Sequence, residues 1–320
     1  MIQAEDIKTI AIAGTGVMGS SMAQIFAQYG YDVILYGRHQ ESMDKGCRMI
    51  ELSQETLVLR GELTKDASDK LVSRIRFSKP GDINVFGEAD FVVENVTESL
   101  EAKQNFWKDC SEAAKPDAVL TTNTSGLSIT KIAEAVKSPK RFCGMHFWNP
   151  PHIIPLIEVI RGDKTDEEAA DITYALSEKI GKKPIHVRKD APGFIGNRLQ
   201  FALLREALYI KEQGVGDFED IDRCMKYGPG FRYACLGPFE VADFGGLDTF
   251  HHISSYLWED LSDAKKPYGL FDELYKQGKF GVKSGSGFYD YSGGKGEKAM
   301  GERDEKYLKL AKCGLDEEEK

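Results

Sequence analysis

Apolar residues gather in short β-rich runs along the first part of the chain, and longer amphipathic stretches separate these runs. The runs fall at residues 9–13, 33–36, 91–93, 118–120 and 142–147. An alternation of strands and helices predicts βαβ units, in which helices cover a parallel sheet. Two further apolar runs, at residues 155–160 and 183–187, extend the predicted sheet.

The pattern changes after the last of these runs. Residues 190–193, Asp-Ala-Pro-Gly, are a strong turn signal, and apolar residues then recur at helical spacing from Phe194 to Ile210. We therefore predict a sheet domain at residues 1–190 and an all-helical domain at residues 191–320. Residues 40–71 also read as helical with a break at Gly61, and the acidic run 316–320 reads as a solvated end.

A glycine-rich turn follows the first apolar run and leads into a helical pattern. Gly14, Gly16 and Gly19 form the spacing G-x-G-x-x-G. The first glycine permits a tight turn, the second lets the backbone approach a pyrophosphate, and the third lets helix and strand pack closely. This context predicts a Rossmann-type, doubly wound dinucleotide-binding domain. The residues expected at the cofactor are Gly14, Gly16, Val17, Met18 and Gly19.

The end of the second run bears on which dinucleotide binds. An acidic residue there would bind the free 2′-hydroxyl of an adenosine ribose, but this chain has Gly37 followed by Arg38. A guanidinium can pair with a 2′-phosphate through charge-assisted hydrogen bonds, so the pattern favours NADP. The alternative is that Arg38 is a solvated charge and that the cofactor is NAD.

Two polar side chains interrupt apolar segments further along. His146 is the last but one residue of the run at 142–147, and Glu158 lies between Ile157 and Val159. A buried carboxylate is costly without a partner, and a histidine is a partner of the right chemistry. If Glu158 accepts a hydrogen bond from one ring nitrogen, the other nitrogen is held ready as a general base. The alternative for each residue is a satisfied core side chain.

Composition narrows the class of protein. The 320 residues carry 42 basic and 51 acidic side chains, a formal net charge of −9, which argues against a broad nucleic-acid surface. No run is long and apolar enough to span a membrane, and the start has no secretory signal pattern, so we expect a cytoplasmic protein. The six cysteines are scattered without C-x-x-C pairs, which predicts neither disulfides nor a metal site.

Five motifs occur in the order typical of one enzyme family, and the chain resembles the 3-hydroxyacyl-CoA dehydrogenases over nearly its whole length. The motifs are Asn-Thr-Ser at 123–125, His-Phe-Trp-Asn-Pro at 146–150, Ile-Glu-Val at 157–159, Pro-Gly-Phe-Ile-Gly-Asn-Arg at 192–198, and Gly-Pro-Phe-Glu at 237–240. The resemblance implies a nicotinamide-dependent oxidoreductase with a helical substrate and dimerisation domain, and hence a homodimer.

The resemblance also assigns roles to residues. It implies that His146 and Glu158 form the acid–base pair, and that Ser125 and Asn197 contact the reacting oxygen of the substrate. Preorganised donors are suited to charge that develops on that oxygen. The alternatives are a helix cap for Ser125 and a cap or core hydrogen bond for Asn197. Further cofactor-side residues in the resemblance are Glu98 and Lys103, for which the alternative is an exposed helical charge pair.

The substrate stays open at this point. The resemblance favours a 3-hydroxyacyl-CoA thioester and a place in fatty acid metabolism. The segment Asn149-Pro150-Pro151, and Phe231-Arg232-Tyr233 ahead of Gly237, are instead similar to dehydrogenases of free 3-hydroxy acids such as gulonate or carnitine. In that case Arg232 would bind a carboxylate. A non-catalytic dinucleotide-binding structural or sensor protein is the alternative from another class.

Overall fold

The structure is a computed structural model that describes residues 1–313, so the predicted solvated end at 316–320 lies outside the described residues. The chain divides into two compact units, residues 1–198 and the part from Leu199 onward. Residues 191–198 thus belong to the first unit, although the turn signal at Asp190 predicted a boundary there. Their contacts explain this, because Gly196 and Asn197 hydrogen-bond to strand and loop residues of the first unit.

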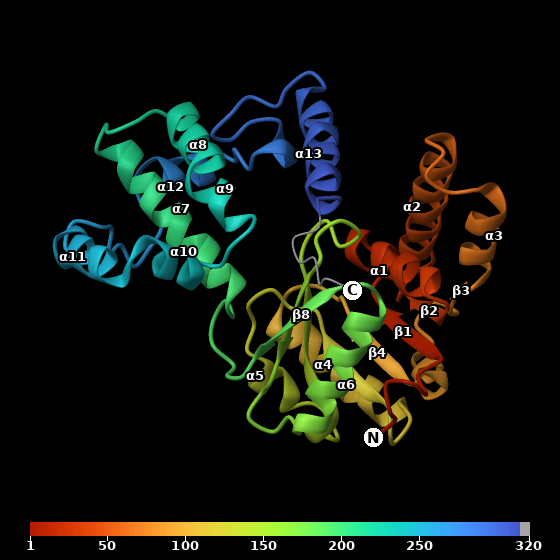
Figure 1. Ribbon diagram of the computed structural model, residues 1–320. Coiled ribbons are helices and arrows are strands. Elements are labelled where there is room, and N and C mark those ends of the chain that lie inside the picture. Colours follow the sequence, from red (N-terminus) through yellow and green to blue (C-terminus); the bar gives the residue numbers. More distant parts are fainter. Residues whose placement is uncertain (314–320) are drawn as a thin grey trace. The chain divides into compact units, whose positions relative to one another are not determined.

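The described part of the first unit contains an eight-stranded sheet with the order β3-β2-β1-β4-β5-β6-β7-β8 (Figure 1). The strands are β1 (Thr9–Ala13), β2 (Asp32–Tyr36), β3 (Ile75–Phe77), β4 (Phe91–Glu94), β5 (Val119–Thr122), β6 (Phe142–Phe147), β7 (Leu156–Ile160) and β8 (Lys183–Val187). The order reverses between β1 and β4, which is the switch point of a doubly wound fold.

The direction of the last two strands differs from the parallel arrangement that the sequence predicted. The strands from β1 to β6 pair in parallel, but β7 runs antiparallel to β6 and β8 runs parallel to β7. The chain segment between β6 and β7 is short, whereas a parallel connection needs a dozen residues or more. The strand β3 was not predicted, since it is only three residues long.

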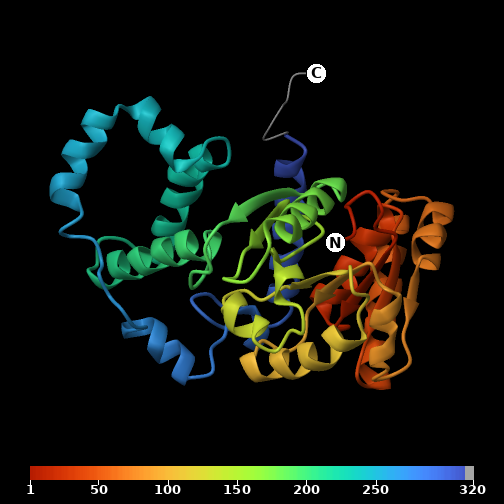
Figure 2. The same cartoon turned by 90° about the horizontal axis from the view of Figure 1, so that it is seen from below.

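Helices cover both faces of the sheet, as the alternating pattern predicted (Figure 2). Ile10 and Ile12 of β1 pack in one core with Met22, Phe26 and Leu176 of α1 and α6, whereas the other face packs against α4 and α5. The helices of this unit are α1 (Val17–Gln28), α2 (Gln40–Leu59), α3 (Lys65–Ser73), α4 (Leu100–Ala113), α5 (Ile129–Ala133) and α6 (Glu167–Lys179), with the short 3-10 helices η1 (Ile83–Glu88) and η2 (Pro139–Arg141).

The prediction of two helices in residues 40–71 is confirmed in outline, because α2 ends at Leu59 and α3 begins at Lys65. Gly61 lies between them with a φ of 70°, a left-handed conformation that glycine adopts without strain. Thr64 caps α3 by accepting a hydrogen bond from the Ala67 amide.

The second unit is helical in its described part, as predicted. Its helices are α7 (Gly196–Glu212), which begins in the first unit, α8 (Phe218–Tyr227), α9 (Pro229–Tyr233), α10 (Pro238–Gly245), α11 (Leu247–Leu257), α12 (Gly269–Lys276), η3 (Val282–Ser284) and α13 (Lys295–Ala311). Among residues 1–313, no helix combines the length and the apolar character that crossing a membrane requires.

Candidate active site

The glycine turn between β1 and α1 is shaped for close backbone approach. A Cβ added at Gly19 would lie 1.9 Å from the carbonyl oxygen of Gly14, so only glycine fits there. Gly14 has a φ of 107°, and its added Cβ would lie 2.6 Å from the carbonyl oxygen of Asn95 at the end of β4. Gly16 is the N-cap of α1 and faces open space within the described residues. A dinucleotide pyrophosphate fits this arrangement of open backbone and helix N-terminus.

The other predicted cofactor residues lie close to this turn. Val17 and Met18 begin α1, and Val17 is 63% exposed. Arg38 follows β2, is exposed, and forms no ion pair with the described residues. Gly37 beside it is packed, since an added Cβ would lie 2.6 Å from the Met43 side chain.

His146 and Glu158 are directly opposite each other on the antiparallel strands β6 and β7. His146 Nδ1 lies 2.8 Å from Glu158 Oε2, and the two side chains are 5% and 0% exposed. Because a carboxylate only accepts hydrogen bonds, Nδ1 carries the proton and the neutral imidazole keeps Nε2 as an acceptor. The reversal of β7 therefore creates a buried dyad in which the histidine tautomer is fixed.

Glu158 receives three further hydrogen bonds that the sequence did not predict. Trp148 Nε1 donates to Oε2 at 3.2 Å, and the amides of Ile195 and Gly196 donate to Oε1 at 3.0 and 2.9 Å. Burial raises the pKa of Glu158, but the hydrogen bonds from His146, Gly196 and Ile195 outweigh burial and leave the pKa below its ordinary value. The buried carboxylate is thus ionised at neutral pH.

The segment that donates these amides is held in an unusual conformation. Gly193 and Phe194 have φ values of 77° and 53°, and a positive φ is rare for a phenylalanine. The Phe194 ring is buried, with its centroid 5.8 Å from that of His146. This turn aims the Ile195 and Gly196 amides at Glu158, which explains the motif at residues 192–198 in physical terms.

Ser125 and Asn197, which the resemblance places at the reacting oxygen of the substrate, lie next to each other in the structure. Asn197 Nδ2 donates to the backbone oxygen of Ser125 at 2.7 Å. Ser125 is exposed, and its hydroxyl makes no hydrogen bond with a described residue. It does not cap α5, because Ser128 is the N-cap and accepts the Lys131 amide. The helix-cap alternative for Ser125 is therefore wrong, and its hydroxyl is available to a ligand.

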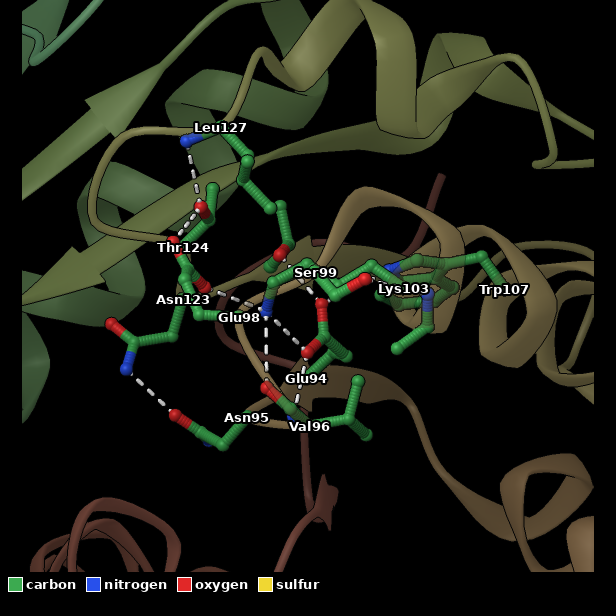
Figure 3. Close-up of polar contacts among 12 residues, drawn as sticks. Glu94, Asn95, Val96, Glu98, Ser99, Lys103, Trp107, Asn123, Thr124 and Leu127 are labelled. Carbon is green, nitrogen blue, oxygen red and sulfur yellow. Dashed lines mark hydrogen bonds and ion pairs between the residues drawn. The ribbon is translucent and has the colours of Figure 1, made fainter.

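Glu98 and Lys103 belong to a polar cluster at the end of β4, not to an exposed charge pair (Figure 3). Lys103 is 1% exposed and pairs with Glu94, which is 0% exposed, with Nζ 2.7 Å from Oε1. Its Nζ also lies 3.3 Å from Oε2 of the half-exposed Glu98. Glu94, which directly follows the apolar run at 91–93, was not among the site residues that the sequence predicted.

Arg232 lies on α9 in the second unit and is exposed, so its role as a carboxylate ligand stays a prediction. Within residues 1–313, no three or more His, Cys, Asp or Glu side chains gather as metal ligands would.

Comparisons with known proteins match both units of the chain to one enzyme family. Residues 9–191 match the family model described as 3-hydroxyacyl-CoA dehydrogenase, NAD binding domain, and residues 193–291 match the C-terminal domain of the same family. A probable 3-hydroxybutyryl-CoA dehydrogenase of Deinococcus radiodurans is 40% identical over 281 residues, covering 88% of this chain and 99% of the relative.

A second relative has a different substrate in its name. The 5-formyl-3-hydroxy-2-methylpyridine 4-carboxylate 5-dehydrogenase of Mesorhizobium japonicum is 37% identical, covering 89% of this chain and 91% of the relative. A crystal structure of a dehydrogenase of this name, described as an NAD+ dependent dismutase, has a TM-score of 0.88 and 36% identity, covering 98% of this chain and 100% of that chain.

Proposed function

Because the chain belongs to the 3-hydroxyacyl-CoA dehydrogenase family, we propose that it transfers a hydride between a nicotinamide dinucleotide and the C3 carbon of a 3-hydroxyacyl-CoA. The observation that carries the proposal is the buried dyad, in which Glu158 fixes the tautomer of His146 through a 2.8 Å contact. A dinucleotide-binding protein without turnover needs no such dyad.

Each residue of the site has its own role in the proposed reaction. The dinucleotide, when bound at the glycine turn, supplies the hydride acceptor. His146 Nε2 takes the proton of the substrate hydroxyl in oxidation and returns a proton in reduction. Glu158, held by its four donors, stabilises the imidazolium that forms. The Ser125 hydroxyl and the Asn197 amide donate to the substrate oxygen, where negative charge develops.

The acyl-CoA substrate is supported by the name of the Deinococcus radiodurans relative and by basic side chains on α2 and α3. Lys45, Lys65 and Lys70 each pair with a carboxylate four residues away on the same helix, and all three are well exposed. Such exposed pairs contribute little to stability, so CoA phosphates can compete for these lysines. Arg48 and Arg60 form no ion pair with the described residues.

A free carboxylate substrate is the second candidate. It is favoured by the likeness to the pyridine-carboxylate dehydrogenase, which extends over 98% of this chain. Arg232 would then bind the carboxylate through its planar guanidinium. Free 3-hydroxy acids of the gulonate or carnitine type belong to the same candidate class.

Parallel assays separate the two candidates. Reduction of acetoacetyl-CoA and of a free 3-oxo acid, and oxidation of the corresponding hydroxy compounds, are followed at the nicotinamide absorbance. Turnover of the thioester at much the higher kcat/KM supports the first proposal. Turnover of the free acid alone supports the free-carboxylate candidate. In that case the Arg232→Ala substitution should raise KM for the acid and leave KM for the dinucleotide unchanged.

We further propose that the enzyme prefers NADP over NAD. The family model and the similar dismutase structure are both named for NAD, whereas Arg38 is exposed and unpaired in the part of this chain that the structure describes. Arg38→Ala should lower kcat/KM for NADPH about tenfold, through loss of one charge-assisted contact, and change that for NADH little. Gly37→Asp is a poorer test, because Met43 crowds the added Cβ. An unchanged NADPH to NADH ratio in Arg38→Ala would assign the enzyme to NAD.

We also propose that the protein forms a homodimer through its helical unit and that it is cytoplasmic. Large apolar side chains on this unit are strongly exposed, among them Phe239 at 86% and Phe244 at 80%. Exposed apolar patches of this kind mark interaction surfaces. All six cysteines are free, which fits a reducing compartment. Light scattering of the purified protein measures the mass, and a monomer at micromolar concentration would refute the dimer.

A further inference from the structure

The polar cluster at the end of β4 contains a fully buried ion pair that the proposed mechanism does not use. Glu94 Oε1 accepts from Lys103 Nζ at 2.7 Å and from the Val96 amide at 2.6 Å. Its Oε2 accepts from Thr122 Oγ1 at 2.6 Å and from Trp107 Nε1 at 3.3 Å. Every contact on this carboxylate is a donor, so both oxygens are saturated and the charge is held in one place.

Lys103 is saturated in the same way. Besides Glu94, its Nζ lies 3.4 Å from the Val96 carbonyl oxygen and 3.3 Å from Glu98 Oε2. An ammonium has three hydrogens to donate, and three oxygens face this one. With a side chain that is 1% exposed, Lys103 has no free donor for a cofactor in this arrangement. Its effect on a ligand must pass through Glu98, which is the member of the cluster that reaches the surface.

Glu98 connects the buried pair to the loop after β5. Its Oε1 accepts the hydroxyl of Thr124 and the Ser125 amide, the latter at 2.9 Å. Thr124 is itself buried, and its Oγ1 accepts the Leu127 amide at 3.0 Å. Glu98 thus has one oxygen on Lys103 and the other on the backbone amide of Ser125, the residue that carries the hydroxyl.

From these contacts we propose that Glu94 is a positioning residue for Ser125, acting through Lys103 and Glu98. The buried carboxylate fixes the ammonium, the ammonium fixes Glu98, and Glu98 holds the Ser125 amide so that the hydroxyl faces the reacting oxygen. The proposal rests on the proposed function for the role of that hydroxyl, but the positioning itself is a property of the free protein.

Replacing Glu94 by glutamine shows why the charge matters. A glutamine side chain offers one acceptor oxygen and one NH2 group, whereas all four native partners donate. In one orientation the NH2 group faces the Lys103 ammonium and the Val96 amide, and in the other it faces the Trp107 indole and the Thr122 hydroxyl, which can rotate to accept. In both orientations Lys103 loses its buried negative partner and keeps Glu98 as its one carboxylate partner in the described cluster. The ammonium then draws Glu98 toward itself and away from the Ser125 amide.

Hydrogen exchange tests the positioning without any assumption about the reaction. In Glu94→Gln and in Lys103→Met, the Ser125 amide should exchange about tenfold faster than in the wild type, since it loses a charge-assisted hydrogen bond. Lys103→Met also covers the case in which Glu94→Gln does not fold, because three donors still satisfy Glu94. Unchanged exchange at Ser125 in the variants that fold would overturn the proposal.

A matched control exists at the other end of the same strand. Asp90 lies just before β4, its Oδ1 pairs with Lys115 Nζ at 2.7 Å, and its Oδ2 accepts the Lys8 and Thr9 amides at 2.9 Å. Asp90→Asn also weakens an ion pair next to β4 but has no contact with the Ser125 loop. It should leave exchange at Ser125 and kcat near the wild-type values. Equal loop exchange in Asp90→Asn and Glu94→Gln would show general loosening and would also overturn the proposal.

A double-mutant cycle tests the consequence for turnover. Glu94→Gln should lower kcat about tenfold in the wild-type background, with KM for the dinucleotide unchanged, and should have little further effect in Ser125→Ala, because the group being positioned is gone. Multiplicative effects would show that Glu94 does not act through Ser125. If the wild type turns over neither thioester nor free acid, the proposed function fails, while the exchange result at Ser125 still decides the positioning.

Discussion

Glu158→Gln is the most informative single substitution. It keeps the volume of the side chain, removes its negative charge and replaces one acceptor oxygen by an NH2 group. The carboxylate accepts four hydrogen bonds, two of them from the Ile195 and Gly196 amides and two from the His146 and Trp148 rings. If the glutamine oxygen stays with the two amides, its NH2 group faces both rings. Trp148 Nε1 cannot accept a hydrogen bond, but His146 Nδ1 can accept one when its proton moves to Nε2.

The tautomer change gives the expected magnitude. A histidine protonated at Nε2 cannot take the substrate proton there, and replacing the carboxylate of such a dyad by an amide lowers turnover by about 10³- to 10⁴-fold. The substitution also replaces charge-assisted hydrogen bonds by neutral ones and leaves Trp148 Nε1 facing another donor, which costs about 1–3 kcal/mol of unfolding free energy. Because the folded-state pKa of Glu158 is lowered, this stability difference is present at neutral pH and disappears as pH falls through that pKa.

The assay compares kcat, dinucleotide affinity and urea unfolding in Glu158→Gln with those in two reference variants. His146→Gln removes the base and should lower kcat about 10²-fold or more with dinucleotide affinity retained. Trp148→Phe removes one donor to Glu158 and leaves the histidine tautomer alone, so kcat should fall by less than about tenfold. The tautomer argument is refuted if Glu158→Gln keeps kcat within tenfold of the wild type while His146→Gln loses it.

Two further predictions concern the crowded glycine turn at Gly19 and the buried ammonium of Lys182. Gly19→Ala places a Cβ 1.9 Å from the Gly14 carbonyl oxygen, so NADH or NADPH affinity should fall at least about tenfold in a fluorescence titration; full affinity would mean that the turn does not hold the pyrophosphate. Burial lowers the pKa of Lys182 from 10.5 to about 8, so the unfolded state binds more protons than the folded state between these values. The unfolding free energy of the wild type, relative to Lys182→Met, should rise from pH 8 to 10 by at most about 1.4 kcal/mol per unit, and parallel pH curves in urea unfolding would contradict this.

Much of the fold was predictable because strand and helix periodicities differ and because Gly14, Gly16 and Gly19 stand in a recognisable context. The direction of β7 was not predicted from the apolar pattern, since a run of apolar residues is the same in either direction. The signal was in the chain length between β6, which ends at Phe147, and β7, which begins at Leu156. That connection is too short for a parallel crossover, so an antiparallel pair was the better prediction.

The candidate site was predictable to the extent that its residues sit in motifs. His146 and Glu158 were paired on chemical grounds, and the structure explains the pairing by their direct register on β6 and β7. Glu94 was missed because a carboxylate at the end of an apolar strand gives no sign of its partner, which comes from the next helix. Trp148 was missed because an indole in an apolar motif looks like packing until its Nε1 is seen 3.2 Å from Glu158.

The two polar networks of the first unit meet at two consecutive residues. The Gly196 amide donates to Glu158, and the Asn197 side chain donates to the backbone of Ser125. Ser125 is in turn held by Glu98 through its amide. One turn of backbone at the start of α7 therefore contacts both Glu158, which orients the base, and the loop that carries the Ser125 hydroxyl. A perturbation of Glu158 should consequently reach Ser125 through this turn, and one of Glu94 should reach it through Glu98, so the geometry at Ser125 depends on both buried carboxylates.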